Sequence, residues 1–465
     1  MRVAKFLRLA GVVALTAAAT TFSLRVVGAD FSPLARDASY RQFVDVYGLV
    51  TDHYYEKVDG DRLLQGAIAG MVGALGDPFS LYMNPDMSAR FRELVSSEFQ
   101  GIGAVLSEAP DGRVRIHAVL PGSPASAAGL RAGDVLLQVN GRRTAGMSLE
   151  RVVEMVRGPA GTSVALVIER RGRTSAVSVR RMALQQATVF ARMLQDRIAY
   201  LYIAQFGPRT AAAFARDLGI LTAEGARGLI VDVRSDPGGL LSAVAAIASD
   251  LLPRGRVIAQ IVARDHQPQL VRSVGPGVHM PVAVLMNAGS ASAAEILAGA
   301  LGAAGDPLFG EKSYGKGTVQ ETQDFRDGSS LKLTVAKWLT PTGSWVHHVG
   351  LTPTVTVPLP SYYRLPPLEP STRAGLAPGE SGVQIAVLQR MLLALGYTPG
   401  RTDGYYSGRT ATAVAAFQRT HGLRPTGRTT PATAYAINIA LLQLRRRDDP
   451  QLAAAVGWME TRLMR

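Results

Sequence analysis

The sequence predicts a multidomain, mixed α/β protein, because the chain is long and its hydrophobic period changes several times along it. It has 465 residues, of which 47% are hydrophobic and 18% charged, with 48 glycines and 26 prolines. At roughly 150 residues per domain, this length allows about three domains with buried cores. The composition excludes a disordered or collagen-like chain. The sequence contains no cysteine, which excludes disulfides, thiolate zinc sites and a cysteine nucleophile.

Residues 1–29 have the pattern of a signal peptide or an N-terminal anchor. Arg2, Lys5 and Arg8 precede a mostly apolar stretch over residues 9–24, and the small residues that signal peptidase prefers follow at 27–29. The apolar stretch is shorter than the roughly 20 residues of a comfortable membrane span. We therefore expect an exported protein, with a cleaved signal favoured over an uncleaved anchor.

Two regions of different period follow. Over residues 30–98, apolar residues recur at spacings of three and four, as at positions 43, 46, 47 and 50, which predicts a helical region. Over residues 99–182 the period is two, with alternating strands at 114–120 and 135–139 and the tight-turn signal Asn140-Gly141. A short helix at 149–156 and strands at 164–168 and 176–180 complete the prediction of a compact, strand-rich domain.

Residues 183–357 are predicted to form an α/β core, because runs typical of buried strands alternate with helical stretches. We expect strands at 198–203, 229–233, 257–262 and 282–286, and helices at 210–218, 240–252 and 293–303.

A proline-rich linker is expected at 358–375, a small helical bundle at 376–440 and a basic tail at 441–465. The whole chain carries 50 Lys and Arg against 36 Asp and Glu, a net charge of +14. Residues 371–465 hold 12 Arg and 5 acidic residues, a net charge of +7. This charge indicates either an anionic polymer as partner or a solvated basic surface.

Ser292 stands where an expected strand meets an expected helix, in the segment Gly289-Ser-Ala-Ser-Ala-Ala-Glu295. A serine there faces the positive end of a helix dipole and unpaired backbone N–H groups, an environment that also suits an oxyanion. The alternative is structural, because Ser292 and Glu295 match the S-x-x-E capping box.

Lys316 lies between two glycines in the segment Tyr314-Gly-Lys-Gly-Thr-Val-Gln320. A lysine acts as a base only when it is neutral, which requires burial to lower its pKa from about 10.4 to near 7. Gln320 could hydrogen-bond Lys316 only if the chain bends, because residues i and i+4 lie about 13 Å apart on a straight strand. The alternative is an ordinary surface lysine.

The segment 231–240 reads as a strand, a Pro-Gly-Gly turn and the start of a helix. Glycine N–H groups exposed at a helix N-terminus form an anion site, and the alternative is a plain connection.

Other chemistries find little support in the sequence. Gly310–Lys316 has the spacing of a phosphate-binding loop, but Gly317 stands where that loop needs Ser or Thr. There is no H-E-x-x-H, and adjacent His347 and His348 would point to opposite faces of a strand, so no metal site is expected. No G-x-S-x-G elbow occurs, which leaves Lys316 as a better base for a nucleophilic serine than any histidine.

Four motifs in one order resemble those of the carboxy-terminal processing proteases, serine peptidases with a Ser–Lys dyad. They are Asp232-Val-Arg…Pro-Gly-Gly, Ser290-Ala-Ser-Ala…Glu-Ile, Gly315-Lys-Gly-Thr-Val-Gln and Lys337-Trp-Leu-Thr-Pro-Thr-Gly. The resemblance covers about 300 residues and implies a crotonase-like protease core at 183–357. Asp236 departs from the family's pattern, since it replaces the usual asparagine, and Ala294 replaces a usual serine.

The resemblance also implies a role for individual residues. Ser292 would be the nucleophile, Lys316 the general base and Gln320 the residue that orients the lysine. The oxyanion donors would be backbone N–H groups of Gly238, Gly239 and Ala293.

Two further regions resemble binding modules. Residues 99–182 resemble the β-barrel-like PDZ domain of these proteases, in which a substrate's C-terminus is held by backbone N–H groups while the peptide adds as a strand. The carboxylate-binding residues would be Gly101, Ile102, Gly103 and Ala104. Residues 376–440 resemble a peptidoglycan-binding domain, on matches that include Leu388-Gln389, Asp403-Gly404 and Phe417-Gln418.

The resemblance therefore implies an exported, wall-tethered or membrane-anchored serine endopeptidase that recognises protein C-termini and cleaves through an acyl-enzyme. Expected partners are proteins with exposed C-termini and peptidoglycan or another wall polymer, with membrane contact only through the N-terminal segment. A homo-oligomer is compatible with the sequence, whereas nucleic acid, metal and cofactors are not expected. The alternative is a catalytically inactive adaptor that keeps both binding modules.

Overall fold

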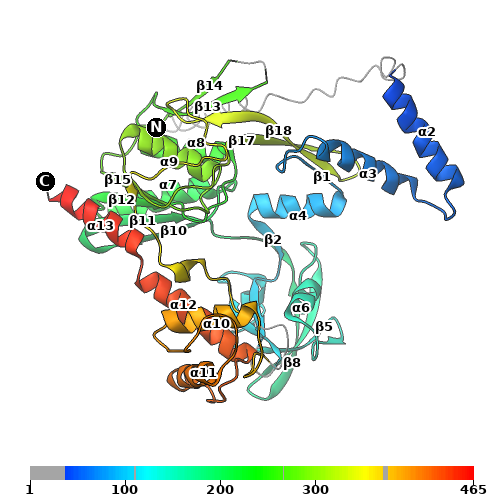
Figure 1. Ribbon diagram of the computed structural model, residues 1–465, viewed down its shortest axis with the longest axis vertical. Coiled ribbons are helices and arrows are strands. Elements are labelled where there is room, and N and C mark those ends of the chain that lie inside the picture. The colour runs from blue at the N-terminus through cyan, green and yellow to red at the C-terminus, as the bar shows by residue number, and fades with distance from the viewer. Residues whose placement is uncertain (1–36, 109–111, 265–266, 370–374, 465) are drawn as a thin grey trace.

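The computed structural model describes residues 37–108, 112–264, 267–369 and 375–464, so the expected signal or anchor at 1–29 lies outside the described residues. The described chain forms two six-stranded sheets, one five-stranded sheet and a two-stranded ribbon, with helices around them (Figure 1). The expected multidomain, mixed α/β architecture is confirmed. None of the described helices is long and apolar enough to cross a membrane.

The N-terminal region is helical, as its period predicts. Helices α2 (Ala38–His53), α3 (Gly60–Gly73) and α4 (Pro85–Ser96) each begin after a side chain that caps backbone N–H groups, Asp37, Asp59 and Asn84 respectively. Between α3 and α4, strand β1 (Leu81–Met83) pairs with β18 (Ser330–Leu339). This region therefore adds an edge strand to a sheet of the core.

The predicted PDZ region has a sheet in the order β3-β4-β5-β7-β8, with β6 paired to β5, so β3 is an edge strand. A two-stranded ribbon, β2 (Glu98–Gly101) and β9 (Met182–Gln185), joins this region to the rest of the chain. The other elements are β3 (Ala104–Glu108), β4 (Val114–Val119), α5 (Pro124–Ala127), β5 (Val135–Val139), β6 (Arg142–Arg143), α6 (Leu149–Val156), β7 (Ser163–Arg170) and β8 (Arg173–Arg180).

The core is built on a sheet whose neighbouring strands are parallel except at one edge. The order is β10-β11-β12-β15-β16-β19, and only β10 and β11 pair antiparallel. The strands are β10 (Val189–Met193), β11 (Ile198–Ile203), β12 (Gly228–Asp232), β15 (Val282–Met286), β16 (Leu308–Gly310) and β19 (Val355–Thr356). Leu229, Val231 and Val284 pack against a layer formed by α7 (Thr210–Ala223), α8 (Leu241–Leu251) and α9 (Ala293–Ala304).

A second sheet, which the sequence did not predict as such, is antiparallel. Its order is β1-β18-β13-β14, and β17 also pairs with β18. The strands are β13 (Val257–Ala263), β14 (Gln269–Arg272), β17 (Thr318–Asp324) and β18. Strand β17 begins two residues after Lys316, so its pairing with β18 fixes the position of the chain immediately after this lysine.

The C-terminal bundle contains α10 (Val383–Ala394), α11 (Gly408–Thr420) and α12 (Pro431–Arg447), which meet around Leu388, Phe417 and Ile437. The expected linker is partly packed against this bundle, since Leu368 is buried in the same cluster. A 3₁₀ turn, η3 (Ser361–Arg364), lies within the linker.

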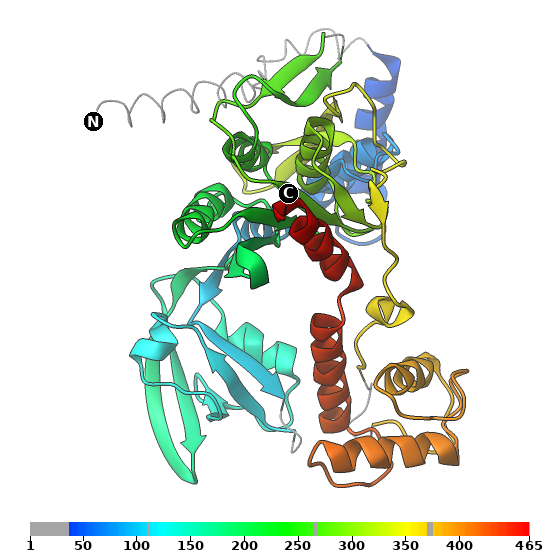
Figure 2. The same ribbon diagram turned by 90° about the vertical axis from the view of Figure 1, so that its left-hand side faces the viewer.

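The expected basic tail at 441–465 is, over its described residues 441–464, mostly helical and belongs partly to the core. Helix α12 continues to Arg447, and α13 (Pro450–Leu463) returns to the core sheet (Figure 2). Ala455 and Met459 of α13 are fully buried against the sheet face opposite the α7–α9 layer, in a cluster with Ile230 and Leu285. The i, i+4 spacing of these two apolar residues is the helical signal that the neighbouring arginines concealed.

An ion-pair network fixes the start of α13. The Arg234 guanidinium lies 2.6 Å from Asp232 Oδ2 and 2.8 Å from Asp449 Oδ2, and all three side chains are nearly buried. The Gln451 amide donates to the Val357 carbonyl at 2.8 Å. Helix α13 is thus attached to the strand end that precedes the Pro-Gly-Gly turn.

We expect Met459→Ala to destabilise the core by about 2–5 kcal/mol, because it removes a fully buried side chain and leaves a cavity against the sheet. Met464→Ala is the matched control, since Met464 at the end of the same helix is 86% exposed. Denaturant unfolding followed by circular dichroism measures both variants. Equal stability of the two variants would show that α13 does not stabilise the core.

Candidate active site

Three loops meet at one edge of the core sheet. Strands β12, β15 and β16 are parallel neighbours, so the loops that follow their carboxyl ends lie together. The Ser290 hydroxyl donates to the Val233 carbonyl at 2.8 Å, and the Tyr314 N–H donates to the Ser290 carbonyl at 3.0 Å. The structure therefore brings the three segments that the sequence singled out to one place.

Ser292 is the N-cap residue of α9 and has a strained backbone, with φ 55° and ψ −112°. A positive φ is uncommon for a residue with a side chain and is retained where the surroundings enforce it. The side chain is half-buried. This local strain is typical of a functional turn rather than of an ordinary helix cap.

The Pro-Gly-Gly turn packs directly against Ser292. A Cβ atom added to Gly238 would lie 2.8 Å from Ser292 Cβ and 3.0 Å from the Ala293 nitrogen, so only glycine allows this approach. A Cβ atom on Gly239 would lie 2.2 Å from the Phe206 carbonyl oxygen. The two glycines thus let the Pro-Gly-Gly turn contact both Ser292 and Phe206, which follows strand β11.

The backbone N–H groups of this turn are not equivalent. The Gly238 N–H donates to Asp236 Oδ1 at 2.7 Å and is engaged within its own turn. Among the residues that the structure describes, the N–H groups of Gly239 and Ala293 have no acceptor. Two of the three predicted oxyanion donors are therefore free in this conformation.

Glu295 joins Ser292 to the lysine loop. Its carboxylate is fully buried and accepts four hydrogen bonds, from the backbone N–H groups of Ser292, Gly315 and Lys316 at 2.7–2.8 Å and from the Ser313 hydroxyl at 2.5 Å. The Ser292 and Lys316 nitrogens bond to the same oxygen, Oε2. Glu295, which the sequence predicted only as part of a capping box, therefore also holds the Lys316 loop about twenty residues away.

Lys316 is half-buried, and its Nζ lies 5.1 Å from the centre of the Phe79 ring. Burial lowers the pKa of Lys316 below its ordinary value, and the like charge of Lys332 lowers it further. Asp77 and Glu295 oppose this shift. The net effect favours the neutral amine, the form that can accept a proton.

Gln320 lies on β17, where its amide donates to the hydroxyls of Thr318 at 2.9 Å and Thr334 at 3.1 Å. The strand has a register shift between Val319 and Gln320, which supplies the irregularity that the sequence required there. In this conformation the predicted orienting residue is held by two threonines and not by Lys316.

The adjacent histidines lie in a turn behind the lysine loop and not on a strand. His348 has φ 57°, and the rings of His347 and His348 are 3.9 Å apart, so the expectation that they point to opposite faces is wrong. His347 Nδ1 accepts the Gly317 N–H at 3.3 Å, and the Trp345 indole donates to the Gly317 carbonyl at 2.9 Å. These contacts brace the glycine that follows Lys316.

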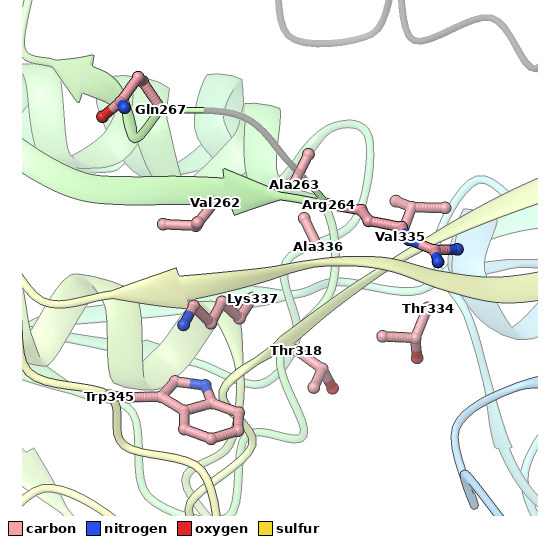
Figure 3. Close-up of a pocket in the computed structure, with 10 residues that line it drawn as sticks. All are labelled: Val262, Ala263, Arg264, Gln267, Thr318, Thr334, Val335, Ala336, Lys337 and Trp345. Atoms are coloured by element: carbon pink, nitrogen blue, oxygen red, sulfur yellow. The ribbon is translucent and has the colours of Figure 1, made fainter. Parts of the chain in front are cut away.

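A cavity of about 610 Å³ lies between β13, β17 and β18 and is lined in part by Trp345 (Figure 3). Lys337 and Trp345 lie side by side in its wall, with Nζ 5.5 Å from the ring centre. Neither Ser292 nor Lys316 lines this cavity, but Thr318 and Thr334, whose hydroxyls accept from Gln320, do.

The predicted carboxylate-binding residues connect the ribbon to the PDZ sheet. Gly101 ends β2, Ile102 is buried in the PDZ core, and Ala104 begins β3. Gly103 has φ 79°, and a Cβ atom there would lie 2.2 Å from Ser123 Cβ, so glycine is required. The loop therefore ends at the edge strand to which a peptide could add.

We expect Glu295→Gln to destabilise the site, because an amide cannot accept four hydrogen bonds and would direct its own N–H groups at backbone donors. The loss should be about 1–3 kcal/mol, measured by denaturant unfolding. Glu224→Gln, at an exposed helix end, is the control and should change stability by less than about 0.5 kcal/mol. A Glu295→Gln variant as stable as this control would refute the role of the carboxylate.

Comparison with known proteins identifies the modules. Residues 197–357 match Peptidase family S41, residues 115–170 a PDZ domain, residues 381–437 a peptidoglycan binding domain, and residues 26–87 the activating protease CtpB N-terminal domain. The predictions of a PDZ domain and a peptidoglycan-binding domain are thereby confirmed.

Similar proteins cover nearly the whole chain. It is 35% identical over 423 residues to the carboxy-terminal processing protease CtpA of Bacillus subtilis, covering 90% of each chain. It is 36% identical over 430 residues to CtpB of the same species, covering 90% of this chain and 89% of that protein. The solved structure of a photosystem II D1 C-terminal processing protease is 29% identical, covers 69% of this chain and 87% of that chain, and has a TM-score of 0.42. The chain therefore belongs to Peptidase family S41, the carboxy-terminal processing proteases, which are serine-type peptidases.

Proposed function

We propose that this protein is an exported endopeptidase that cleaves proteins through a Ser292–Lys316 dyad after a PDZ domain has captured their C-termini. The observation that carries the proposal is the Glu295 carboxylate, whose Oε2 accepts the N–H groups of both Ser292 and Lys316 at 2.8 Å. A single buried anion thus fixes the two backbones from which the nucleophile and the base extend.

The dyad works through the neutral lysine. Lys316 Nζ accepts the proton of the Ser292 hydroxyl, and the resulting alkoxide attacks the peptide carbonyl. The negative charge that develops on the carbonyl oxygen is stabilised by the N–H groups of Gly239 and Ala293. The ammonium of Lys316 then gives its proton to the departing amine, which leaves an acyl-enzyme that water hydrolyses. Lowering of the Lys316 pKa by burial supports this role.

Gln320 and Gly238 complete the proposed site after local adjustment. Gln320 would orient Lys316 once its amide leaves the hydroxyls of Thr318 and Thr334. Gly238 would offer its N–H to the oxyanion once that group leaves Asp236. Both changes exchange one local hydrogen-bond partner, at the turn that packs against Ser292 and on the strand that follows Lys316.

The PDZ domain is proposed to bind the free C-terminus of the substrate. Its strand β3 is at the edge of the sheet and lies beside α6, so an extended peptide can add as the next strand. The backbone at Gly101, Ile102, Gly103 and Ala104 would hold the terminal carboxylate.

The peptidoglycan-binding domain is proposed to hold the enzyme at the cell wall, outside the cytoplasm. The basic surface of the C-terminal region would add attraction to anionic wall polymers. An inactive adaptor would use the same binding modules, but it would not need a strained serine and a lysine of lowered pKa whose backbones are held by one carboxylate.

We expect Ser292→Ala and Lys316→Ala each to lower the cleavage of an unfolded protein by about 10³-fold or more, as removal of a nucleophile or its base does in other serine peptidases. Lys316→Arg should be equally inactive, because a guanidinium does not give up its proton. Lys312→Ala, at an exposed position four residues earlier, is the control and should keep normal activity.

Covalent labelling separates the enzyme from the adaptor. A serine-reactive phosphonate should modify Ser292 in the parent protein and in Lys312→Ala, but not in Ser292→Ala. Retained cleavage by a folded Ser292→Ala variant would refute the dyad.

For the PDZ domain, we expect amidation of a peptide's C-terminus to weaken its binding to full-length Ser292→Ala by about 10–100-fold, because hydrogen bonds to the terminal carboxylate are lost. Calorimetric titration with the free-acid and amidated forms of one peptide makes the comparison. If the free-acid and amidated peptides bind equally well, the protein does not recognise the terminal carboxylate.

A further inference from the structure

Asp236 bonds to two backbone segments beside Ser292, the Ala291 segment that precedes it and the Gly238 turn that packs against it. Its carbonyl accepts the Ala291 N–H at 2.9 Å, on the residue before Ser292. Its side-chain Oδ1 accepts the Gly238 N–H at 2.7 Å, and Gly238 is in turn packed against Ser292 Cβ. One residue therefore determines both how the serine turn is held and where the Gly238 donor points.

The carboxyl group of Asp236 is fully buried and only half satisfied. Its Oδ2 has no hydrogen-bond partner among the described residues. A buried carboxylate with one hydrogen bond is unfavourable, because it has lost its hydration without gaining a counter-charge. The neutral acid fits this position better than the anion does.

The charged and titratable groups around the turn do not supply a cation for Asp236. Arg234 is paired with Asp232 and Asp449, and Tyr202 on β11 contributes only a neutral phenol. Glu295 on α9 is engaged with the lysine loop, where it accepts the Lys316 backbone N–H at 2.8 Å and acts on the pKa of the Lys316 amine. Burial raises the pKa of Asp236 to about 8, opposed by the Gly238 hydrogen bond alone.

We propose that Asp236 is a positioning residue for the oxyanion turn, and that the turn is competent only while this carboxyl group is neutral. The proposal rests on the dyad function proposed above.

Two physical effects make the ionised form inhibitory. A charged carboxylate holds the Gly238 N–H more strongly than a neutral acid does, which keeps this donor away from the substrate. Its negative charge also lies beside the place where the oxyanion develops, in a buried region where repulsion is strong. Loss of the Asp236 proton to solvent should therefore slow acylation without any change in fold.

The two titrating groups then give opposite limbs to the pH profile. Activity rises with pH as Lys316 becomes neutral and falls as Asp236 ionises. Above about pH 9, ionisation of Asp236 should lower acylation about tenfold for each further pH unit relative to an enzyme that cannot ionise at this position, in proportion to the remaining neutral acid.

The test is Asp236→Asn, because an amide keeps the shape and the oxygen acceptor for Gly238 but cannot ionise. We expect the rate of Ser292 labelling by a phosphonate, and kcat/KM for an unfolded protein, to stay on their plateau up to about pH 10 in this variant. Relative to this variant, the parent protein should lose both rates over the same range. Circular dichroism at each pH verifies that the proteins stay folded.

Asp250→Asn is the matched control. Asp250 also carries a carboxyl group whose pKa burial raises, to about 6, although this residue at the end of α8 is half-buried where Asp236 is fully buried. This variant should keep the alkaline loss of the parent protein. A general effect of removing any buried carboxyl group would instead appear in both variants.

Three results would overturn the proposal. One is a fall of the labelling rate at alkaline pH that is as large in Asp236→Asn as in the parent protein, even if the variant is slower than the parent at every pH. Another is loss of the alkaline limb in Asp250→Asn as well. If Asp236→Asn does not fold, the parent protein decides, and labelling that does not fall between about pH 8 and pH 10 refutes the role. Failure to label Ser292 at any pH would instead refute the dyad itself.

Discussion

The buried carboxylate of Glu295 is the contact on which the site depends. It accepts hydrogen bonds from the first turn of α9 and from the loop that follows β16. Without it, the N–H groups of Ser292, Gly315 and Lys316 and the Ser313 O–H would lose their acceptor, each at a cost of about 1–3 kcal/mol. The same contact that satisfies the helix end therefore sets the separation of Ser292 from Lys316.

This arrangement reconciles the structural and chemical interpretations of the S-x-x-E motif. Glu295 does bond the Ser292 N–H, as a capping box requires, yet Ser292 has a φ of 55° that an ordinary cap does not need. The strain turns the serine toward the glycine turn, where the Gly239 and Ala293 donors lie. One set of hydrogen bonds thus both caps the helix and fixes the backbones of Ser292 and Lys316.

Local patterns predicted the elements well, and long-range contacts account for what was missed. The strands Ile198–Ile203 and Val282–Met286 and the helix Leu149–Val156 have the bounds that their periodicity indicates. The candidate residues Ser292 and Lys316 were found from their flanking residues. Phe79, which lies over Lys316, is more than two hundred positions away in the sequence, and no local pattern links the two. The sequence did not predict helix α13, because the arginines near it resemble those of a basic tail. A signal was nevertheless present: the apolar runs of β12 and β15 are typical of strands that are buried on both faces, so a second layer had to pack against the sheet.

The return of α13 to the core has a mechanical consequence. The peptidoglycan-binding domain is joined to the protease by two connections, the segment after β19 and the helix that is anchored through Asp449 and Met459. A load applied to that domain is therefore shared between two attachments, one of which ends at the strand preceding the Pro-Gly-Gly turn. Tension on the bundle would therefore reach the strand end before the Pro-Gly-Gly turn through Asp449 and Arg234.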